Sequence, residues 1–211
     1  MDTFTGIPAA ALEFYAALEE NNSKAWWLEH KEQYDAEVRR PLEALAGALE
    51  PRFGTAKIFR PYRDVRFSPD KTPYKTAQGM FLSNHEGVGF YLQVSADGLL
   101  AGGGYHSHSP AQLARYRAGV DASASGQALD TILAALQAAG FRIEGETLKT
   151  VPRGLAKDHP RAELLKHKTL SASIAPGRPD WMDDAQAEAR IAGLWEQLRP
   201  LVDWVVRYAA P

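Results

Sequence analysis

The sequence predicts an α+β fold, in which helices pack mainly on one face of an antiparallel sheet. Two changes of pattern predict it. Apolar residues recur at helical spacing over residues 8–50, alternate with polar ones from about residue 57 to 104, and return to helical spacing after residue 109. Helical and strand segments are therefore grouped along the chain. We expect one domain over residues 1–211, with an N-terminal helical hairpin and a C-terminal helix.

The first 50 residues predict the helical hairpin. Pro8 suits the first position of a helix, and Asn21-Asn22 stops its apolar pattern. Either Asn22 or Ser23 then caps a second helix, because a short polar side chain accepts hydrogen bonds from the free N–H groups of the first turn. Pro41 lies inside the apolar pattern of this second helix, so we expect a kink or a break there.

The middle of the chain predicts four strands. Their bounds are residues 57–67, 77–83, 88–95 and 99–104. Pro61 marks an edge position or a bulge in the first of them. Asp97-Gly98 predicts a hairpin between the last two, because a type I′ turn needs positive φ at both central positions and these residues tolerate it. Tight hairpins of this kind require antiparallel pairing.

The C-terminal part predicts helices with short strands between them. The helices are expected to begin at Ser109-Pro110, to cover 126–139, to begin again near Pro160 and to cover 183–208, and the strands to cover 141–143, 147–151 and 169–174. Gly140 is suited to end the second of these helices, because glycine adopts the left-handed conformation without strain. Pro200 predicts a kink or a restart in the last helix.

Composition excludes several classes of protein. Apolar residues make up 45% of the chain and charged residues 24%, which is the balance of a soluble globular domain. No apolar stretch approaches the roughly 20 residues needed to span a bilayer, and the first residues lack the pattern of a secretory signal. The chain has no cysteine, which rules out disulfides, thiol catalysis and thiolate metal sites. We expect a cytoplasmic protein without membrane contact.

Charge is unevenly distributed along the chain. The net charge is −2, but residues 57–75, which we call the basic segment, carry six Lys or Arg residues against two Asp residues. A near-neutral total argues against a general binder of nucleic acid or membrane surfaces, which needs a broad excess of positive charge. The local excess leaves room for an anion site.

Within the basic segment, Arg63 has the most constrained environment. The alternation of a strand places it on the apolar side, with Val65 and Phe67. An Arg on that side must be paired, because removing one partner of a buried ion pair costs about 3–5 kcal/mol. We expect Arg63 to be largely buried and bonded to Asp64 or Asp70.

The side chains of the basic segment predict a preorganised anion pocket. Guanidinium groups bind phosphate or carboxylate in a bidentate way, lysines add charge, and hydroxyl groups donate hydrogen bonds. Pro69 and Pro73 stiffen the segment. The candidate ligand-binding residues are Arg60, Arg63, Asp64, Arg66, Ser68, Asp70, Lys71, Tyr74 and Lys75, with Lys166 and Lys168 at the rim. The expected ligand is a small molecule that bears phosphate or carboxylate.

Two other functions fit the same segment. A nucleic-acid-binding module would use the basic face, with Tyr62 and Tyr74 as stacking surfaces. Alternatively, an Arg–Asp network fastens a proline-rich loop to the sheet, and the domain has a structural or interaction role. No pair of nucleophile and base stands out in the sequence, so enzymatic activity is left open.

The basic segment also carries a family resemblance. The run Arg63-Asp64-x-Arg66-Phe67-Ser68-x-Asp70-Lys71-x-Pro73-Tyr74-Lys75-Thr76 resembles the signature of Domain of Unknown Function 2461, a family of conserved hypothetical proteins. Other stretches that resemble the family are Asn21-Asn22 with Trp26, Gly102-Gly103-Gly104 with Leu113 and Arg117, Pro152-Arg153-Gly154, Asp158-His159-Pro160, and Lys166 with Lys168. The resemblance implies no activity, substrate or catalytic residue.

Three other groups of residues could carry chemistry. Asp158-His159 is an acid–base dyad or, alternatively, a cap for the short helix that follows. His106 and His108 offer two imidazoles, but zinc needs three or four ligands and no third is evident, so we expect no metal. The glycine run 102–104 lacks the spacing of a dinucleotide fingerprint or a phosphate loop. It predicts a bulge or close packing, and we expect no cofactor.

Overall fold

The computed structural model describes residues 3–64, 66, 70–105 and 109–210. The chain forms two compact units. The first unit comprises residues 1–82, 91–101 and 175–193, and the second comprises residues 83–90, 102–174 and 194–211. Several strands and the last helix contribute residues to both units. The expectation of one domain over the whole chain stays a prediction.

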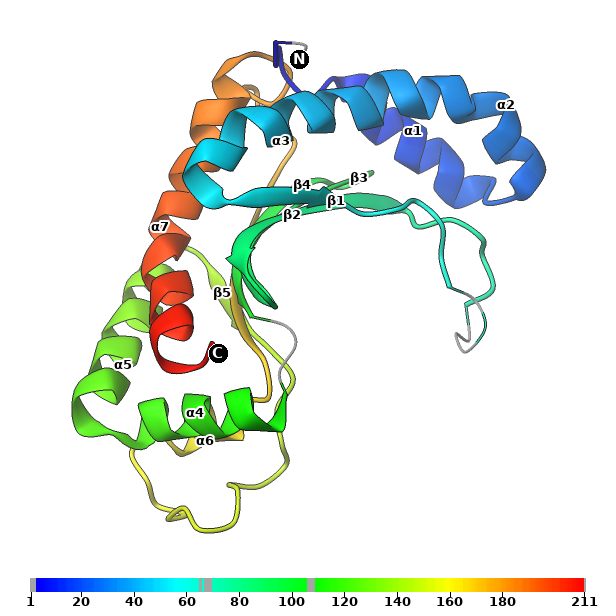
Figure 1. Cartoon of the computed structure of the whole chain (residues 1–211). Coiled ribbons are helices and arrows are strands. Elements are labelled where there is room, and N and C mark those ends of the chain that lie inside the picture. The colour runs from blue at the N-terminus through cyan, green and yellow to red at the C-terminus, as the bar shows by residue number, and fades with distance from the viewer. Residues whose placement is uncertain (1–2, 65, 67–69, 106–108, 211) are drawn as a thin grey trace. The chain divides into compact units, whose positions relative to one another are not determined.

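A six-stranded antiparallel sheet with flanking helices confirms the α+β class (Figure 1). The strands are β1 (Thr55–Ile58), β2 (Ala77–His85), β3 (Val88–Ser95), β4 (Gly98–Tyr105), β5 (Arg142–Glu144) and β6 (Leu170–Gly177), in the order β1-β2-β3-β4-β6-β5. The helices are α1 (Ala9–Glu20), α2 (Lys24–Tyr34), η1 (Asp35–Arg39), α3 (Arg40–Phe53), α4 (Pro110–Asp121), α5 (Ser123–Ala138), α6 (Ala162–Lys166) and α7 (Gln186–Tyr208). Among the described residues, no helix has the length and apolar character needed to cross a membrane.

In the first unit, α1, α2 and α3 lie on one face of the strands (Figure 1). Met80 of β2 and Leu92 of β3 point to that face and are fully buried. The alternate positions Phe81, Tyr91 and Gln93 belong to the other face and are half-buried. The sheet of this unit therefore has a core face under the helices and an open face, and the open face adjoins the basic segment.

The predicted kink at Pro41 takes the form of a π-helical turn. Ser23 caps α2, as expected, by accepting a hydrogen bond from the Trp26 N–H at 3.3 Å. The helix then widens over η1, where the Arg40 N–H donates to the carbonyl of Asp35, five residues earlier. A proline inside a regular α-helix collides with the carbonyl four residues before it. The wider turn just before Pro41 relieves that collision, so the helix continues into α3.

The predicted strand over residues 57–67 is wrong beyond its first residues. Among the described residues of this range, β1 ends at Ile58, and one isolated bridge joins Tyr62 to Tyr74. Prolines explain the short pairing, because they have no N–H group to donate. The carbonyls of Pro73 and Pro61 accept from the N–H groups of Arg63 at 2.9 Å and Lys75 at 2.8 Å. A regular ladder cannot extend through prolines on both strands.

The hairpin between β3 and β4 is confirmed, but its predicted turn type is wrong. The turn residues are Ala96 and Asp97, and neither has a positive φ. Gly98 is the first residue of β4 and carries the positive φ, at +104°. A two-residue turn followed by a glycine with positive φ also matches the right-handed twist of the two strands, as a type I′ turn does. A Cβ on Gly98 would also lie 2.1 Å from the carbonyl oxygen of Gly177.

The helices of the second unit follow most of the predicted signals. Ser109 and Gln112 form a capping box at the start of α4, with hydrogen bonds of 3.2 and 2.8 Å. Gly140 follows the end of α5 with a φ of +89°. Pro200 lies inside α7 without the predicted restart, because the buried apolar face of that helix continues on both sides of it.

Two shorter predictions in the second unit need correction. The strand expected over 147–151 is reduced to a bridge between Thr147 and His167. Pro152 follows closely and has no N–H group to extend a ladder. The helix expected near Pro160 begins at Ala162. The strands expected over 141–143 and 169–174 are confirmed as β5 and β6, which pair through Ile143 and Ala172.

Candidate functional site

The basic segment connects β1 to β2 in the first unit, and the Tyr62–Tyr74 bridge holds its two arms together. The neighbours of these tyrosines make the hydrogen bonds, so Tyr62 and Tyr74 form a non-hydrogen-bonded pair, whose side chains lie close. Their ring centres are 5.5 Å apart. Because side chains alternate between faces, Arg63 and Lys75 lie on the opposite face of the bridge.

The side chain of Asn22 anchors the basic segment to the corner between α1 and α2. Its Oδ1 accepts from the Tyr74 N–H at 3.1 Å, and its Nδ2 donates to the Tyr74 carbonyl at 3.0 Å. In a non-hydrogen-bonded pair, the N–H and C=O groups of Tyr74 point away from Tyr62. The amide of Asn22 therefore pairs with them as a neighbouring strand would. Of the two residues predicted as alternative caps of α2, Ser23 is the one that supplies the cap.

Aromatic packing reinforces this anchor. The ring of Tyr74 stacks on Trp27 at 4.2 Å with 9° between the planes, and Trp27 also contacts Tyr34 at 4.8 Å. The Tyr34 hydroxyl donates to Gln78 Oε1 at 2.7 Å. Tyr74, one of the predicted ligand residues, is 4% exposed and packs against the helices, whereas Tyr62 is 49% exposed. Of the two proposed stacking surfaces, only the ring of Tyr62 faces solvent.

Two Arg–Asp pairs lie within the basic segment. Arg63 Nη1 is 2.6 Å from Asp70 Oδ2, which confirms the expected pairing, although Arg63 is only partly buried, with 28% of its side chain exposed. Arg66 binds Asp64 in a bidentate way, at 3.0 and 2.7 Å. Hydrogen bonds from Arg66 lower the pKa of Asp64, and hydrogen bonds from Thr72, with a smaller effect of Arg63, lower the pKa of Asp70. These four charges neutralise each other in pairs.

Two other cations of the segment lie over the ring of Phe59. The ammonium groups of Lys57 and Lys75 lie 5.8 and 5.7 Å from the centre of that ring. Burial lowers the pKa of Lys75, and the charges of Arg60 and Arg63 lower it further. No acidic residue contributes to that shift. We call Lys57, Arg60 and Lys75 the cation face.

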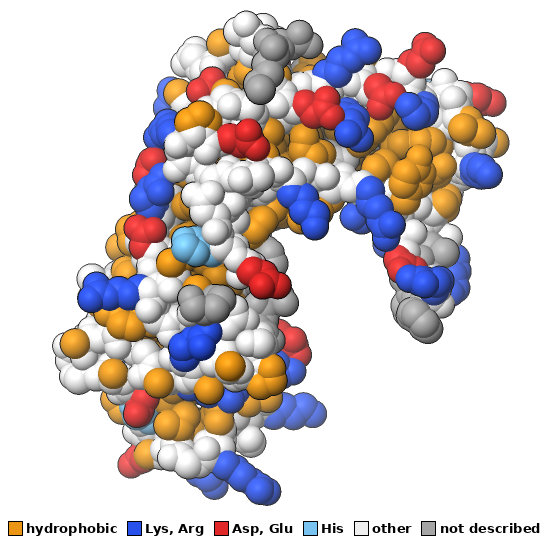
Figure 2. Space-filling model, in the orientation of Figure 1, with side chains coloured by type: hydrophobic (Ala, Val, Ile, Leu, Met, Phe, Trp, Pro, Cys, Tyr) orange, Lys and Arg blue, Asp and Glu red, His pale blue; other side chains and the backbone are white. Residues whose placement is uncertain are grey.

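Figure 2 shows a group of hydrophobic side chains on the face of the molecule that it draws. They lie between α2 and the segment after β1, and Lys and Arg side chains surround them. On the open face of the sheet, the rings of Phe59 and Tyr91 have their centres 6.3 Å apart. Phe59 donates its N–H to the Gly79 carbonyl at 3.0 Å, so its ring lies beside β2. We call Phe59 and Tyr91 the aromatic floor.

The remaining predicted site residues do not all lie beside the cation face and the aromatic floor. Lys166 and Lys168 belong to the second unit, where they pair with Glu163 and Glu146. Lys71 is exposed. Ser68 lies outside the described residues, as do His106 and His108. Lys57, Phe59 and Tyr91 were not among the predicted site residues, although the alternation of Lys57 and Phe59 was the available signal for their shared face.

The predicted Asp158-His159 dyad does not form. His159 Nε2 lies 3.3 Å from Asp121 Oδ1, and His159 Nδ1 accepts from the Arg161 N–H at 3.0 Å. Two adjacent side chains seldom face each other, and here the imidazole turns toward α4. No side chain caps α6. Within the described ranges, no group of three His, Asp or Glu side chains is placed to hold a metal ion.

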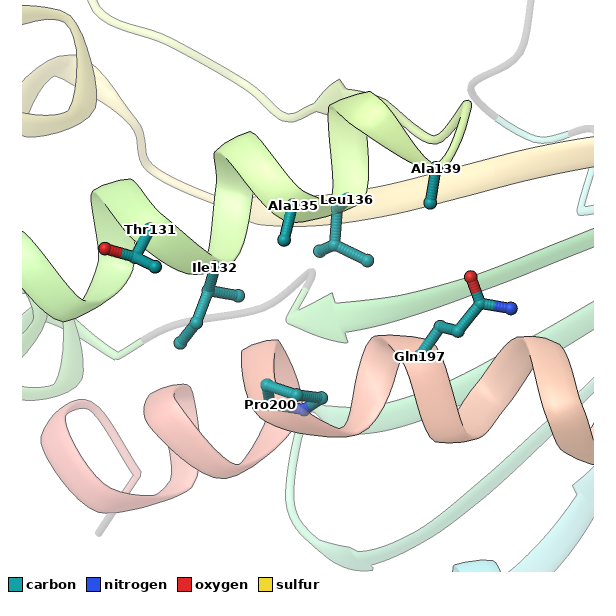
Figure 3. A pocket seen from close by; sticks show the side chains of 7 residues that line it. All are labelled: Thr131, Ile132, Ala135, Leu136, Ala139, Gln197 and Pro200. Atoms are coloured by element: carbon teal, nitrogen blue, oxygen red, sulfur yellow. The ribbon is translucent and has the colours of Figure 1, made fainter.

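A concavity of about 320 Å³ lies in the second unit between α5 and α7 (Figure 3). Its lining residues are Thr131, Ile132, Ala135, Leu136, Ala139, Gln197 and Pro200. None of them is charged, and most are apolar. This hollow has no cation in its lining and only Thr131 and Gln197 as polar side chains, so it does not compete with the cation face as an anion site.

Comparison with known proteins places the whole fold in one family. The family model described as "Conserved hypothetical protein (DUF2461)" matches residues 10–204. This range contains both the basic segment and the Asn22 anchor. No curated protein matches the chain.

Proposed function

We propose that this chain, which belongs to the DUF2461 family of conserved hypothetical proteins, binds a small phosphate- or carboxylate-bearing ligand at its cation face. The observation that carries the proposal is the convergence of two ammonium groups on one ring. Lys57 and Lys75 lie at 5.8 and 5.7 Å from the centre of Phe59. The exposed Arg60 adds a third positive charge, which acts on Lys75.

Gathered like charges favour an anion. Burial, and after it the charges of Arg60 and Arg63, disfavour the charged form of Lys75 and lower its pKa. A bound phosphate or carboxylate removes the repulsion and forms charge-assisted hydrogen bonds. Arg63 and Arg66 have their own carboxylates, so in this proposal they hold the basic segment in shape while the cation face binds.

Two observations favour a small ligand over a nucleic acid. Tyr74 is buried under Trp27, which leaves Tyr62 as the one exposed ring of the two that a stacking surface would use. The net charge of −2 also lacks the broad positive excess of a polymer-binding surface. The purely structural role accounts for the Arg–Asp pairs, but it gives no reason for two ammonium groups over one ring, with the charge of Arg60 acting on one of them.

Thermal unfolding in the presence of simple anions tests the proposal. Inorganic phosphate, pyrophosphate and citrate should raise the Tm, because a ligand that binds only the folded state adds about 2.7 kcal/mol of stability at 100 times its Kd. Arg60→Gln should remove most of this rise and leave the ligand-free Tm nearly unchanged, since Arg60 is exposed.

The matched control is Arg142→Gln, which removes an exposed arginine from β5 in the second unit. This variant should keep the full ligand-induced rise in Tm. The absence of any rise in the parent protein, or an equal loss in both variants, would refute the proposed site. A rise that decreases only mildly from 50 to 200 mM salt fits a single small anion, whereas a polymer releases many counterions and loses affinity steeply.

A further inference from the structure

We propose that a second concavity in the first unit binds a small α-amino acid, whose carboxylate pairs with Arg40 and whose ammonium group donates to the carbonyl of Ala36. The concavity has a volume of about 150 Å³. It is lined by residues 3–6 and, at the junction of η1 and α3, by Ala36, Arg40, Pro41 and Ala44. We call it the N-terminal hollow. None of its lining residues belongs to the cation face, so its occupant is independent of the ligand proposed there.

The π-helical turn leaves the Ala36 carbonyl without a helical partner. In the wide register of η1 this carbonyl would accept from position 41, but Pro41 has no N–H group. In the regular register it would accept from Arg40, whose N–H group donates to the Asp35 carbonyl instead. Within the described ranges, no other group donates to it. Helical carbonyls point toward the C-terminal end of the helix, so that of Ala36 points toward residues that line the hollow.

The guanidinium group of Arg40 lies near this carbonyl. A helical side chain leans over the turn before it, and for Arg40 that turn contains Ala36. The neighbouring Arg39 pairs with Glu43, four positions later, at 2.7 Å. The residues four positions before and after Arg40 are Ala36 and Ala44, which leave space in place of a carboxylate. Arg40 is exposed, and no carboxylate in the part of the chain that the structure describes pairs with it.

The first residues of the chain add hydroxyl groups from a fixed segment. Phe4 is buried, and the Ile7 N–H donates to the Met182 carbonyl at 2.8 Å. Thr3 and Thr5, on either side of Phe4, are exposed and line the hollow. A hydroxyl group both donates and accepts hydrogen bonds, so it can serve either charged group of an amino acid.

This combination of groups selects the class of ligand. Arginine binds a carboxylate in a bidentate way, whereas a backbone carbonyl can only accept and therefore suits an ammonium group. An α-amino acid carries both groups on one carbon, which fits the neighbouring positions of Arg40 and Ala36. A cavity of about 150 Å³ holds benzene, which has as many non-hydrogen atoms as alanine. The N-terminal hollow therefore suits a small amino acid.

The test compares L-alanine with propionate, which lacks its ammonium group, and with ethylamine, which lacks its carboxylate. NMR titrations of the full chain follow the amide signals of Thr5 and Arg40 at neutral pH. L-Alanine should bind at least about tenfold more tightly than either analogue, because a hydrogen bond to a charged group contributes about that much or more. Equal affinities for L-alanine and propionate, or no saturable shift with L-alanine, would refute the proposed ligand.

Pro41→Ala tests the role of the Ala36 carbonyl. The substitution restores an N–H group at position 41, so this carbonyl gains a backbone donor in either helical register: position 41 in the wide one or Arg40 in the regular one. The variant should bind L-alanine no more tightly than propionate and keep the parent's affinity for propionate. A variant that retains the preference for L-alanine would overturn the proposal.

Arg40→Gln should abolish the binding of L-alanine and propionate alike and leave the ligand-free Tm nearly unchanged, since Arg40 is exposed. Arg39→Gln is the matched control, because it removes an arginine of the same turn whose partner is Glu43. It should keep both the affinity for L-alanine and the preference over propionate. An equal loss of binding in the two variants would contradict the proposal, because it would show an effect of general charge.

Discussion

A single side-chain amide, that of Asn22, connects the helical hairpin to the backbone of the basic segment. It makes two hydrogen bonds to Tyr74, at 3.1 and 3.0 Å, and both are partly shielded from solvent. The buried stack of Trp27 on Tyr74 lies beside them. At the scale of one residue, the position of the basic segment therefore depends on contacts made with the corner between α1 and α2.

Asn22→Ala should destabilise the protein by about 1–3 kcal/mol, because each lost hydrogen bond contributes about 0.5–1.5 kcal/mol. Urea unfolding followed by tryptophan fluorescence measures the change. Asn21→Ala is the control, because the Asn21 side chain makes one exposed hydrogen bond to the Ala17 carbonyl. It should change stability by no more than about 0.5 kcal/mol. Equal effects of the two substitutions would show that Asn22 is no anchor.

Lys75 should give anion binding a pH dependence. Its pKa lies below the ordinary value of 10.5, chiefly through burial and then through Arg60 and Arg63. Anion binding needs the charged form, so affinity should begin to fall at a lower pH than for an ordinary lysine. In the ligand-free protein, folding stability should change with pH in the opposite direction. A lowered lysine pKa costs stability at pH values below that pKa, and this cost is lost as the pH rises through the pKa.

Phosphate affinity measured from pH 8 to 9.5 checks this prediction. Lys75→Arg should bind with little pH dependence in that range, because a guanidinium group stays protonated. Lys24→Arg, a change at an exposed position at the start of α2, should keep the parent's profile. A parent profile identical to that of Lys75→Arg would show that Lys75 does not bind the anion.

At the scale of elements, prolines determine where the pairing of strands stops, and glycines determine where the chain turns. Pro61 lies opposite Lys75 and Pro73 lies opposite Arg63, and neither proline has an N–H group to donate. The described part of the basic segment is therefore limited to one bridge. Arg63 and Lys75 are thereby left on one face of a short, braced loop. Gly98 has a comparable role in the β3–β4 hairpin, where its φ of +104° completes the turn.

Gly98→Ala should be strongly destabilising. Backbone in a sparsely populated region costs about 1–3 kcal/mol for a residue other than glycine, and the new Cβ would lie 2.1 Å from the Gly177 carbonyl oxygen. Because the colliding atom belongs to backbone, it cannot move aside easily. Thermal unfolding of the variant should show a clearly lower Tm.

Gly193→Ala should not destabilise the protein. Gly193 lies in α7, and a Cβ there would meet no atom within 4 Å. Alanine is favoured over glycine in a helix by about 0.8–1.0 kcal/mol, so this variant should melt at the parent's temperature or above it. A Gly98→Ala protein as stable as Gly193→Ala would show that the turn tolerates a side chain.

At the scale of the whole molecule, a nearly neutral chain carries a local excess of positive charge in the basic segment. The net charge of −2 conceals the excess in the basic segment, and the structure divides that excess further. Arg63 and Arg66 are bound to carboxylates of the same segment, whereas the cation face has three positive charges beside an aromatic surface. The positions of charged residues in the sequence could not distinguish the paired arginines from the cation face, because the pairing depends on how the loop folds.

Much of the fold could be predicted because its signals are local. Ser23 and Ser109 cap helices, Gly140 ends one, and the alternation over 88–95 identifies a strand, since each feature depends on residues a few positions apart. The errors have local causes as well. Proline restricted the strand predicted over 57–67, and the β3–β4 turn used one glycine with positive φ in place of two such residues.

Local patterns in the sequence were sufficient to predict the α+β class, most helix ends, the hairpin and the location of the basic segment. The pairing of the cations, the burial of Tyr74 and the anchoring role of Asn22 became known from the folded structure. Asn22 and Tyr74 are 52 positions apart in the chain. A sequence pattern reports the conformation of neighbouring residues, whereas the partner of a side chain depends on which elements pack together when the chain folds.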